Sequence, residues 1–207
     1  MGKTKMRDFI GRWKSRDTQD IINISKTDDT YSVRWGLEND DTYSYQGIGI
    51  YVEGNLVVAK APLKAIKYGI GIYKPIGDRK SNSALWASTQ NKGILGSGIA
   101  IREDVSNNYE GHYKVRYFIN GIESPLYDLD IVSSTKNTYN LTWSIEGITK
   151  LHGTGIIDNS KMILAWGEIG FTYDVNIISI NEFNRLNITY TRVNGCINNE
   201  EYNEIKA

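Results

Sequence analysis

The sequence predicts an all-β protein made of two tandem copies of an antiparallel up-and-down meander. Its composition points to strands, because the 207 residues include 14 Tyr and 20 Gly but only 3 Pro. Apolar and polar residues alternate with a period of two, as half-buried strands require. Three landmarks also recur in the same order, with segments 30–35, 47–50 and 56–59 returning as 138–143, 153–156 and 162–165.

Turn signals divide each copy into short strands. In the second copy, Tyr139, Leu141 and Trp143 share one face of an alternating segment. Turn sequences such as Glu53-Gly54-Asn55 and Asn120-Gly121 indicate hairpins. The first copy is expected to form strands at 10–16, 20–26, 31–37, 44–52, 55–61, 67–75, 83–88 and 95–103. The second is expected to form them at 109–119, 122–133, 138–146, 149–158, 161–167, 171–180 and 185–193.

The duplication sets the expected domain boundaries. We expect a first β-barrel repeat at 1–105, a second at 106–195 and a polar C-terminal tail at 196–207. An antiparallel meander exposes two edges unless it closes, and closure gives a small barrel like those of avidin and the lipocalins. Two such barrels are the preferred architecture. The alternative is one larger barrel or sandwich that shares strands of both copies.

Charge and cysteine content narrow the partners and the location. The 24 basic and 24 acidic residues cancel, so neither nucleic acid nor an anionic membrane is an expected partner. Residues 1–16 are basic and the C-terminal tail is acidic. We interpret the basic segment as a solvated end that meets the acidic tail. The lone Cys196 cannot form an internal disulfide and no apolar signal segment is present, so a cytoplasmic location is expected. The sequence does not indicate an oligomeric state.

Glycine clusters at 47–49, 69–71 and 93–98 superficially resemble phosphate-binding loops. Such loops need a helix N-terminus directly after the glycines, whereas here an alternating strand pattern follows. Glycine at every second position leaves one face of a strand bare. We expect the bare faces to allow strand coiling or to admit a bulky aromatic side chain from a neighbouring strand. No cofactor is expected.

Aromatic side chains are the candidate ligand-binding groups, because ligand-holding barrels often line their mouths with them. The candidates are Trp35, Trp86, Trp143, Trp166 and Tyr113. Trp35 and Trp143 occupy equivalent repeat positions on the apolar face, which favours a shared core-packing role for them. Trp86 and Trp166 have no equivalent Trp in the other copy, which suggests that the two copies differ in function.

Catalytic and metal-binding patterns are sparse. Neither His112 nor His152 lies in a motif that would orient it as a base or a ligand, and no Gly-x-Ser-x-Gly, His-Glu-x-x-His or Cys-x-x-Cys motif is present. Asp128, Asp130 and Asp174 alternate with apolar residues, and we expect them on the solvent face of their strands. The prediction is therefore a protein with no catalytic residues and no metal site.

The second copy also contains a fixed order of strand motifs. They are Gly-x-Tyr-x-Val from Gly111, Tyr-x-Leu-x-Ile from Tyr127, Tyr-x-Leu-x-Trp from Tyr139 and Gly-x-Gly-Ile from Gly153. This order resembles a bacterial β-barrel repeat family whose members are sometimes labelled fibronectin-binding. The usual family ending, Leu-x-Gly-x-Trp, would fall at Leu85, but Trp86 is out of register with it. The resemblance supplies no catalytic residues.

Two functional hypotheses follow. The leading one is a non-catalytic binding protein that holds a small ligand or glycan in a Trp/Tyr-lined barrel. The alternative is a protein–protein interaction factor, such as a host- or phage-interaction module, that acts through a sheet edge or the basic N-terminal segment. An isomerase or hydrolase with a lumen site near His112 or His152 is a third hypothesis, which we favour least.

Overall fold

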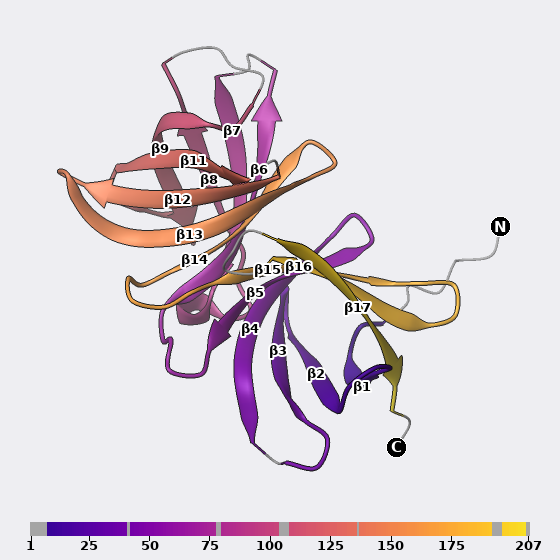
Figure 1. Cartoon of the computed structure of the whole chain (residues 1–207). Helices are drawn as coiled ribbons and strands as arrows, with labels where there is room; N and C mark the ends of the chain where they lie inside the picture. Colours follow the sequence, from indigo (N-terminus) through magenta and orange to yellow (C-terminus); the bar gives the residue numbers. More distant parts are fainter. Residues whose placement is uncertain are drawn as a thin grey trace.

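The computed structural model describes residues 8–40, 42–77, 80–103, 108–135, 137–191 and 196–205. The chain folds into two closed antiparallel barrels of eight strands each, as the sequence predicts (Figure 1). The strands are β1 (Gly11–Ser15), β2 (Asp20–Thr27), β3 (Thr30–Leu37), β4 (Tyr43–Val52), β5 (Asn55–Pro62), β6 (Tyr68–Ile76), β7 (Ser81–Ser88), β8 (Gly96–Ile101), β9 (Gly111–Ile119), β10 (Ile122–Glu123), β11 (Tyr127–Thr135), β12 (Thr138–Ile145), β13 (Ile148–Asp158), β14 (Lys161–Gly167), β15 (Asp174–Ile180), β16 (Arg185–Thr191) and β17 (Ile197–Glu204). A short 3-10 helix, η1 (Thr89–Asn91), follows β7. No helix in the described ranges is long and apolar enough to cross a lipid bilayer.

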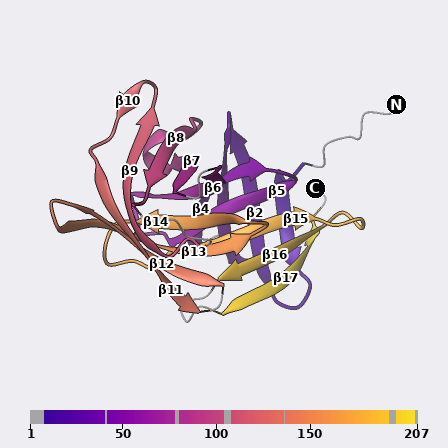
Figure 2. The same cartoon turned by 90° about the horizontal axis from the view of Figure 1, so that it is seen from above.

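The first barrel takes its strands from both ends of the chain. Its order is β1-β17-β16-β15-β5-β4-β3-β2, and β2 pairs with β1 to close it. The second barrel consists of β6 to β9 and β11 to β14, closed by the pairing of β8 with β9, while β10 extends the sheet beside β9. Figure 2 shows this partition from above, with β15, β16 and β17 on the side of β2 and β9 to β12 on the opposite side.

Strand register identifies the counterparts of the two copies. Ala59 of β5 pairs with Val175 of β15, and Ala165 of β14 pairs with Ile70 of β6. Because Ala59 and Ala165 are equivalent repeat positions, β15 stands in the first barrel where β6 stands in the second. The same correspondence joins β16 to β7 and β17 to β8. Each copy therefore gives its last three strands to the barrel of the other, which is domain swapping within one chain.

This exchange changes the expected domain boundaries. The contiguous halves 1–105 and 106–195 are not the two barrels, because β6 to β8 belong to the second and β15 to β17 to the first. The boundary itself falls among residues 104–107, outside the described residues. The expected polar tail at 196–207 contains β17, which pairs with both β1 and β16. A single larger barrel does not form, although the sharing of strands that this alternative assumed does occur.

Three apolar clusters hold the fold together. One fills the first barrel around Trp13 and Trp35, and another fills the second around Tyr113 and Trp143. The third lies between the barrels and takes residues from β4, β5 and β6 and from β13, β14 and β15. It contains Tyr68 and Tyr173, which precede or begin equivalent strands and stack with their ring centroids 6.2 Å apart. This contact between counterparts lies where a two-fold relation between the copies would place it.

The strands β5 and β14 face a core on both sides. In β5, Leu56 and Val58 point into the first barrel, while Val57 and Ala59 point toward the second. All four side chains are buried. Ion pairing adds to this interface, because Glu53 in the turn before β5 accepts from Lys74 at 2.8 Å and also pairs with Lys161. The contact with Lys161, followed by that with Lys74, lowers the pKa of Glu53 to about 2.

Alternating glycines make room for aromatic side chains inside the barrels. A Cβ on Gly47 would lie 2.9 Å from the Trp35 ring, and one on Gly98 would lie 2.8 Å from the Tyr117 ring. A Cβ on Gly69 would overlap both the Trp166 ring and a backbone carbonyl. The prediction that bare strand faces admit bulky aromatics is therefore confirmed. The glycine clusters continue as strands β4, β6 and β8, so they lack the helix that a phosphate loop needs.

Candidate functional site

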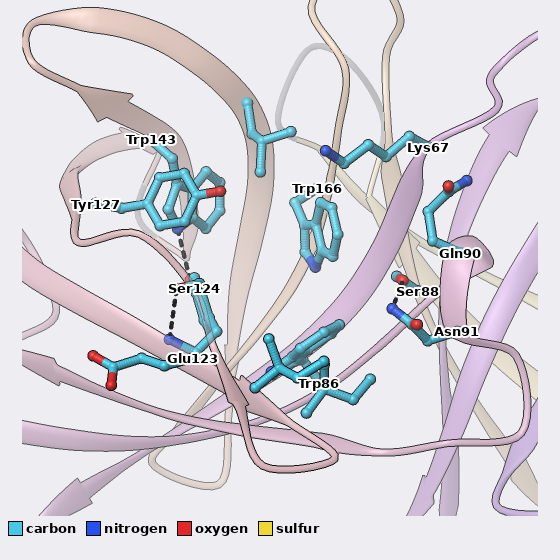
Figure 3. A pocket seen from close by; sticks show the side chains of 14 residues that line it. Lys67, Trp86, Ser88, Gln90, Asn91, Glu123, Ser124, Tyr127, Trp143 and Trp166 are labelled. Atoms are coloured by element: carbon cyan, nitrogen blue, oxygen red, sulfur yellow. Dashed lines mark hydrogen bonds between the residues drawn. The ribbon is translucent and has the colours of Figure 1, made fainter.

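A cavity of about 220 Å³ lies at the end of the second barrel where β9 meets β10 and β7 meets η1. Five aromatic side chains from five different strands line it, namely Trp86, Tyr117, Tyr127, Trp143 and Trp166. Figure 3 shows the labelled Trp86, Trp166, Trp143 and Tyr127 gathered around one space. The rest of the lining consists of the aliphatic residues Ile119, Ile122 and Leu151 and of polar residues, including Lys67, Gln90, Asn91, Glu123 and Ser124.

Ring contacts and hydrogen bonds hold the aromatic wall in place. The ring centroids of Trp86 lie 6.4 Å from those of Trp166 and 6.0 Å from those of Tyr117, both in edge-to-face geometry. Trp86 Nε1 donates to the Ser97 carbonyl at 2.9 Å. Trp143 Nε1 donates to the Tyr117 hydroxyl at 2.7 Å. The indole N–H groups of Trp86 and Trp143 are thus satisfied by the protein itself.

The tyrosines of this wall are neutral hydrogen-bonding groups. The hydroxyls of Tyr117 and Tyr73 lie 2.5 Å apart, and burial is the main cause that raises the pKa of each well above its ordinary value. Burial also raises the pKa of Tyr127. Because these phenols stay protonated at physiological pH, the wall carries no charge of its own.

The structure brings three of the five predicted ligand-binding residues together. Trp86, Trp143 and Trp166 line the cavity of the second barrel, whereas Trp35 lines a separate cavity of about 330 Å³ in the first. Trp35 and Trp143 are also core residues, with 6% and 1% of their surface exposed, as their equivalent positions predicted. Tyr113 lies within the core of the second barrel and donates its hydroxyl to the Tyr109 carbonyl at 2.9 Å.

Sequence reasoning missed two members of the aromatic wall, Tyr117 and Tyr127. Both lie on strand faces that the alternation already defined, since Tyr117 follows Tyr113 and Val115 at a period of two. Tyr127 likewise precedes Leu129 by two residues. Extending the inward face of each strand to its end would have found both.

The acidic strand residues divide between the outer surface and a lumen. Asp128 and Asp130 lie on the outside of the second barrel, as expected, where Asp128 pairs with Lys114. The prediction for Asp174 is wrong, because this residue lines the cavity of the first barrel. Its neighbour Val175 packs between the two barrels, so the face of β15 that carries Asp174, Asn176 and Ile178 points into the lumen of the first barrel.

Neither histidine lines either of these two cavities. His112 lies on the outer surface, where its Nδ1 is 2.7 Å from an Asp130 oxygen, and this hydrogen bond is the main cause that raises its pKa. His152 packs edge-on against Tyr173, with ring centroids 5.5 Å apart. Among the described residues, no group of three or more His, Cys, Asp or Glu side chains could hold a metal ion.

The basic N-terminal segment meets the acidic end of the chain, as predicted. Arg16 pairs with Glu201 on β17, and Lys14 pairs with Glu38. Three further basic residues of this segment, Lys3, Lys5 and Arg7, lie outside the described residues.

Comparison of the chain with protein-family models, with curated proteins and with solved structures gave no match. The resemblance of its strand motifs to the fibronectin-binding-labelled barrel repeat therefore stays a prediction. The functional proposal below rests on the two strand-exchanged barrels and their cavities.

Proposed function

We propose that this chain is a non-catalytic binding protein whose second barrel holds a small, flat, largely apolar molecule. The observation that carries this proposal is the aromatic wall, in which Trp86, Trp143, Trp166, Tyr117 and Tyr127 line one cavity. Ligand pockets are typically concave and aromatic, with a few polar groups that fix orientation. Here the polar groups of Lys67 and Gln90 play the orienting role.

The chemistry of the wall favours an apolar ring over a glycan. The indole N–H groups of Trp86 and Trp143 already donate to protein acceptors, so these two offer no further donor to a sugar hydroxyl. A hydroxyl that leaves water without gaining a partner costs free energy, whereas an aromatic ring gains contact area and edge-to-face geometry. An apolar ring is therefore the better complement to this lining.

Two further observations support binding rather than catalysis or edge pairing. Neither histidine lines either cavity, so no imidazole forms part of these two walls to act as an acid or base. Closure of both sheets also leaves little free strand edge in the described part of the chain, where β10 is a two-residue edge strand. Cys196 is exposed and forms no disulfide, which agrees with the reducing cytoplasm that we propose as the location.

The test is a titration with N-phenyl-1-naphthylamine, a neutral apolar fluorophore whose emission rises in apolar surroundings. We expect a saturable rise with one equivalent bound per chain. Trp86→Ala and Trp166→Ala should each weaken binding by about tenfold or more, because each removes an aromatic wall from the ligand.

The matched control is Phe118→Ala. Phe118 follows Tyr117 on β9, so it points to the opposite, outer face of the same strand, and it does not line the cavity. The Phe118→Ala variant should bind the fluorophore as tightly as the unmodified protein does. Absence of saturable binding, or equal loss in Phe118→Ala and Trp86→Ala, would contradict the proposal.

A further inference from the structure

The cavity of the first barrel has a different chemical character from that of the second. It measures about 330 Å³, and its lining includes Asp20, Lys60, Asp174, Asn176 and Glu200. Three carboxylic side chains and one ammonium thus share a space that also contacts the ring of Trp35. This cavity lies in the other barrel from the aromatic wall, so an inference about it stands independently of the function proposed above.

The exchanged strand β15 carries two of these polar groups into the lumen. Val175 packs between the barrels, and the side chains on either side of it, Asp174 and Asn176, therefore face inward. Register places Asp174 opposite Lys60 of β5. The counterparts of Asp174 and Asn176 in the second barrel are Gly69 and Gly71, which pair with Trp166 and Leu164. The first barrel holds polar side chains where the second holds none.

Asn176 is a buried cavity residue whose side-chain amide nitrogen lacks a hydrogen-bond partner. Only 2% of its surface is exposed, and its side-chain Nδ2 has no hydrogen-bond partner. Buried donors without a partner are rare in folded proteins, because each loses its hydrogen bonds to water and gains none in return. Since Asn176 lines the cavity, an acceptor oxygen on a bound molecule can satisfy this nitrogen. Asn198 of β17 carries a second amide nitrogen without a partner, two residues before Glu200.

Glu200 is held in place to receive a positive charge. Its two carboxylate oxygens accept hydrogen bonds from the hydroxyls of Tyr190 at 2.9 Å and Tyr202 at 2.7 Å. These bonds fix the carboxylate at the cavity wall without neutralising it. The Lys60 ammonium lies 4.3 Å from the centroid of the Tyr45 ring and 5.1 Å from that of the Trp35 ring. The cavity lining contains the three acidic residues named above and Lys60 as its one basic residue, so acidic groups outnumber basic ones by three to one.

We propose that the first barrel binds a small polar molecule that carries both a protonated amine and an acceptor oxygen. The amine faces the carboxylate of Glu200, and the oxygen accepts from Nδ2 of Asn176. A metal ion is a poorer complement, because no cluster of three metal-ligating side chains occurs among the described residues.

Calorimetric titration at low ionic strength tests this site with two amines and their neutral counterparts. The amines are ethanolamine and glucosamine, and the counterparts are ethylene glycol and glucose. We expect at least one amine to bind with one equivalent per chain, at least about tenfold more tightly than its neutral counterpart, and more weakly as salt is added. Failure of both amines to bind, or equal binding of amine and counterpart, overturns the proposal.

Variants locate the binding within the barrel. Glu200→Gln keeps an acceptor for the tyrosine hydroxyls but removes the charge, and should weaken amine binding by about tenfold or more. Asn176→Ala should weaken it as well. The matched control is Glu201→Gln, the adjacent residue on β17, which pairs with Arg16 and Arg185 instead of lining the cavity. Equal losses in Glu200→Gln and Glu201→Gln would overturn the assignment, because they would indicate only a long-range effect of charge.

The thermal unfolding of each variant is compared with that of the unmodified protein, so that a folding defect is not mistaken for lost binding. The outcome is also separable from that of the proposed function. Trp86→Ala and Trp166→Ala report on the fluorophore in the second barrel, while the amines report on the first. One site can therefore fail while the other is upheld.

Discussion

The two barrels share a fold, a strand order and an inner-face geometry, but they place opposite chemistry at equivalent positions of their cavities. Trp35 and Trp143 are counterparts, and each forms part of the wall of its own cavity. Around them the second barrel presents aromatic side chains and glycines where the first presents charges and amides. The counterpart pairs, second barrel first, are Trp166 and Lys60, Tyr127 and Asp20, Gly69 and Asp174, Gly71 and Asn176, and Gly98 and Glu200. Trp86 and Tyr190 are also counterparts, and at this position both barrels carry an aromatic side chain.

The contrast between the two cavities indicates where a duplicated barrel is free to diverge. The deep core residues remain apolar in both copies, because a polar group there would be buried without a partner. The cavity positions lie near the barrel ends, where a ligand or water can satisfy polar groups. Substitution at these positions changes what the cavity accepts without changing the strand pairing that closes the barrel.

Splitting the chain should have the largest effect on this comparison. A fragment of residues 1–105 contains β1 to β8, yet three of these strands complete the other barrel. We expect neither 1–105 nor 106–207 to form a stable monomeric barrel alone, and the two fragments to recover the native fold when produced together. Size-exclusion chromatography with circular dichroism measures both outcomes. A folded monomer of 1–105 would show that each copy can close on itself.

Adding a side chain to a bare strand face should have an intermediate effect on stability. Gly69→Ala places a Cβ against the Trp166 ring and the Ala87 carbonyl. The carbonyl belongs to the backbone of the paired strand, so it cannot move away. We expect a loss of about 1–3 kcal/mol in the free energy of unfolding, measured with urea. The control is Gly77→Ala, where an added Cβ meets nothing within 4 Å. Equal effects in the two variants would mean that the glycine face is not needed to seat Trp166.

The smallest effect should come from a titrating pair on the outer face of the second barrel. His112 pairs with Asp130, while the counterpart position in the first barrel is Arg12, opposite Asn23. The folded-state pKa of His112 is raised, so its contribution to stability is fully present below the unfolded pKa of about 6.5 and is lost as the pH rises through the folded value. Because the pair is largely exposed, this contribution is below about 1 kcal/mol.

The measurement for this pair is urea unfolding at pH 5.5 and pH 8.5. His112→Gln should destabilise the protein at pH 5.5 and have little effect at pH 8.5. Arg12→Gln should show no such dependence on pH, because the guanidinium stays charged at both values. A larger loss at pH 8.5 than at pH 5.5 for His112→Gln would contradict the assigned direction.

The strands and the aromatic candidates are predictable because their signals are local. Strands β1 to β8 form within a few residues of the expected segments, and the turns at Glu53-Gly54 and Asn120-Gly121 connect their hairpins as expected. The segment expected at 122–133 divides into β10 and β11. Strand β17 was not expected, because Glu200, Glu201 and Glu204 make its sequence resemble a solvated tail. Its pairing with both β1 and β16 supplies backbone hydrogen bonds that composition does not reveal.

Local sequence patterns were enough to predict the all-β class, the duplication, most strand positions and the use of alternating glycines to seat aromatic rings. Which strands close which barrel is visible only in the fold, because hairpin periodicity is the same whether a strand pairs within its own copy or across copies. The fold also fixes which face of β15 is inside. A period of two separates the faces of a strand, but packing of one barrel against the other buries an outer face as well, and this turns Asp174 and Asn176 into the lumen.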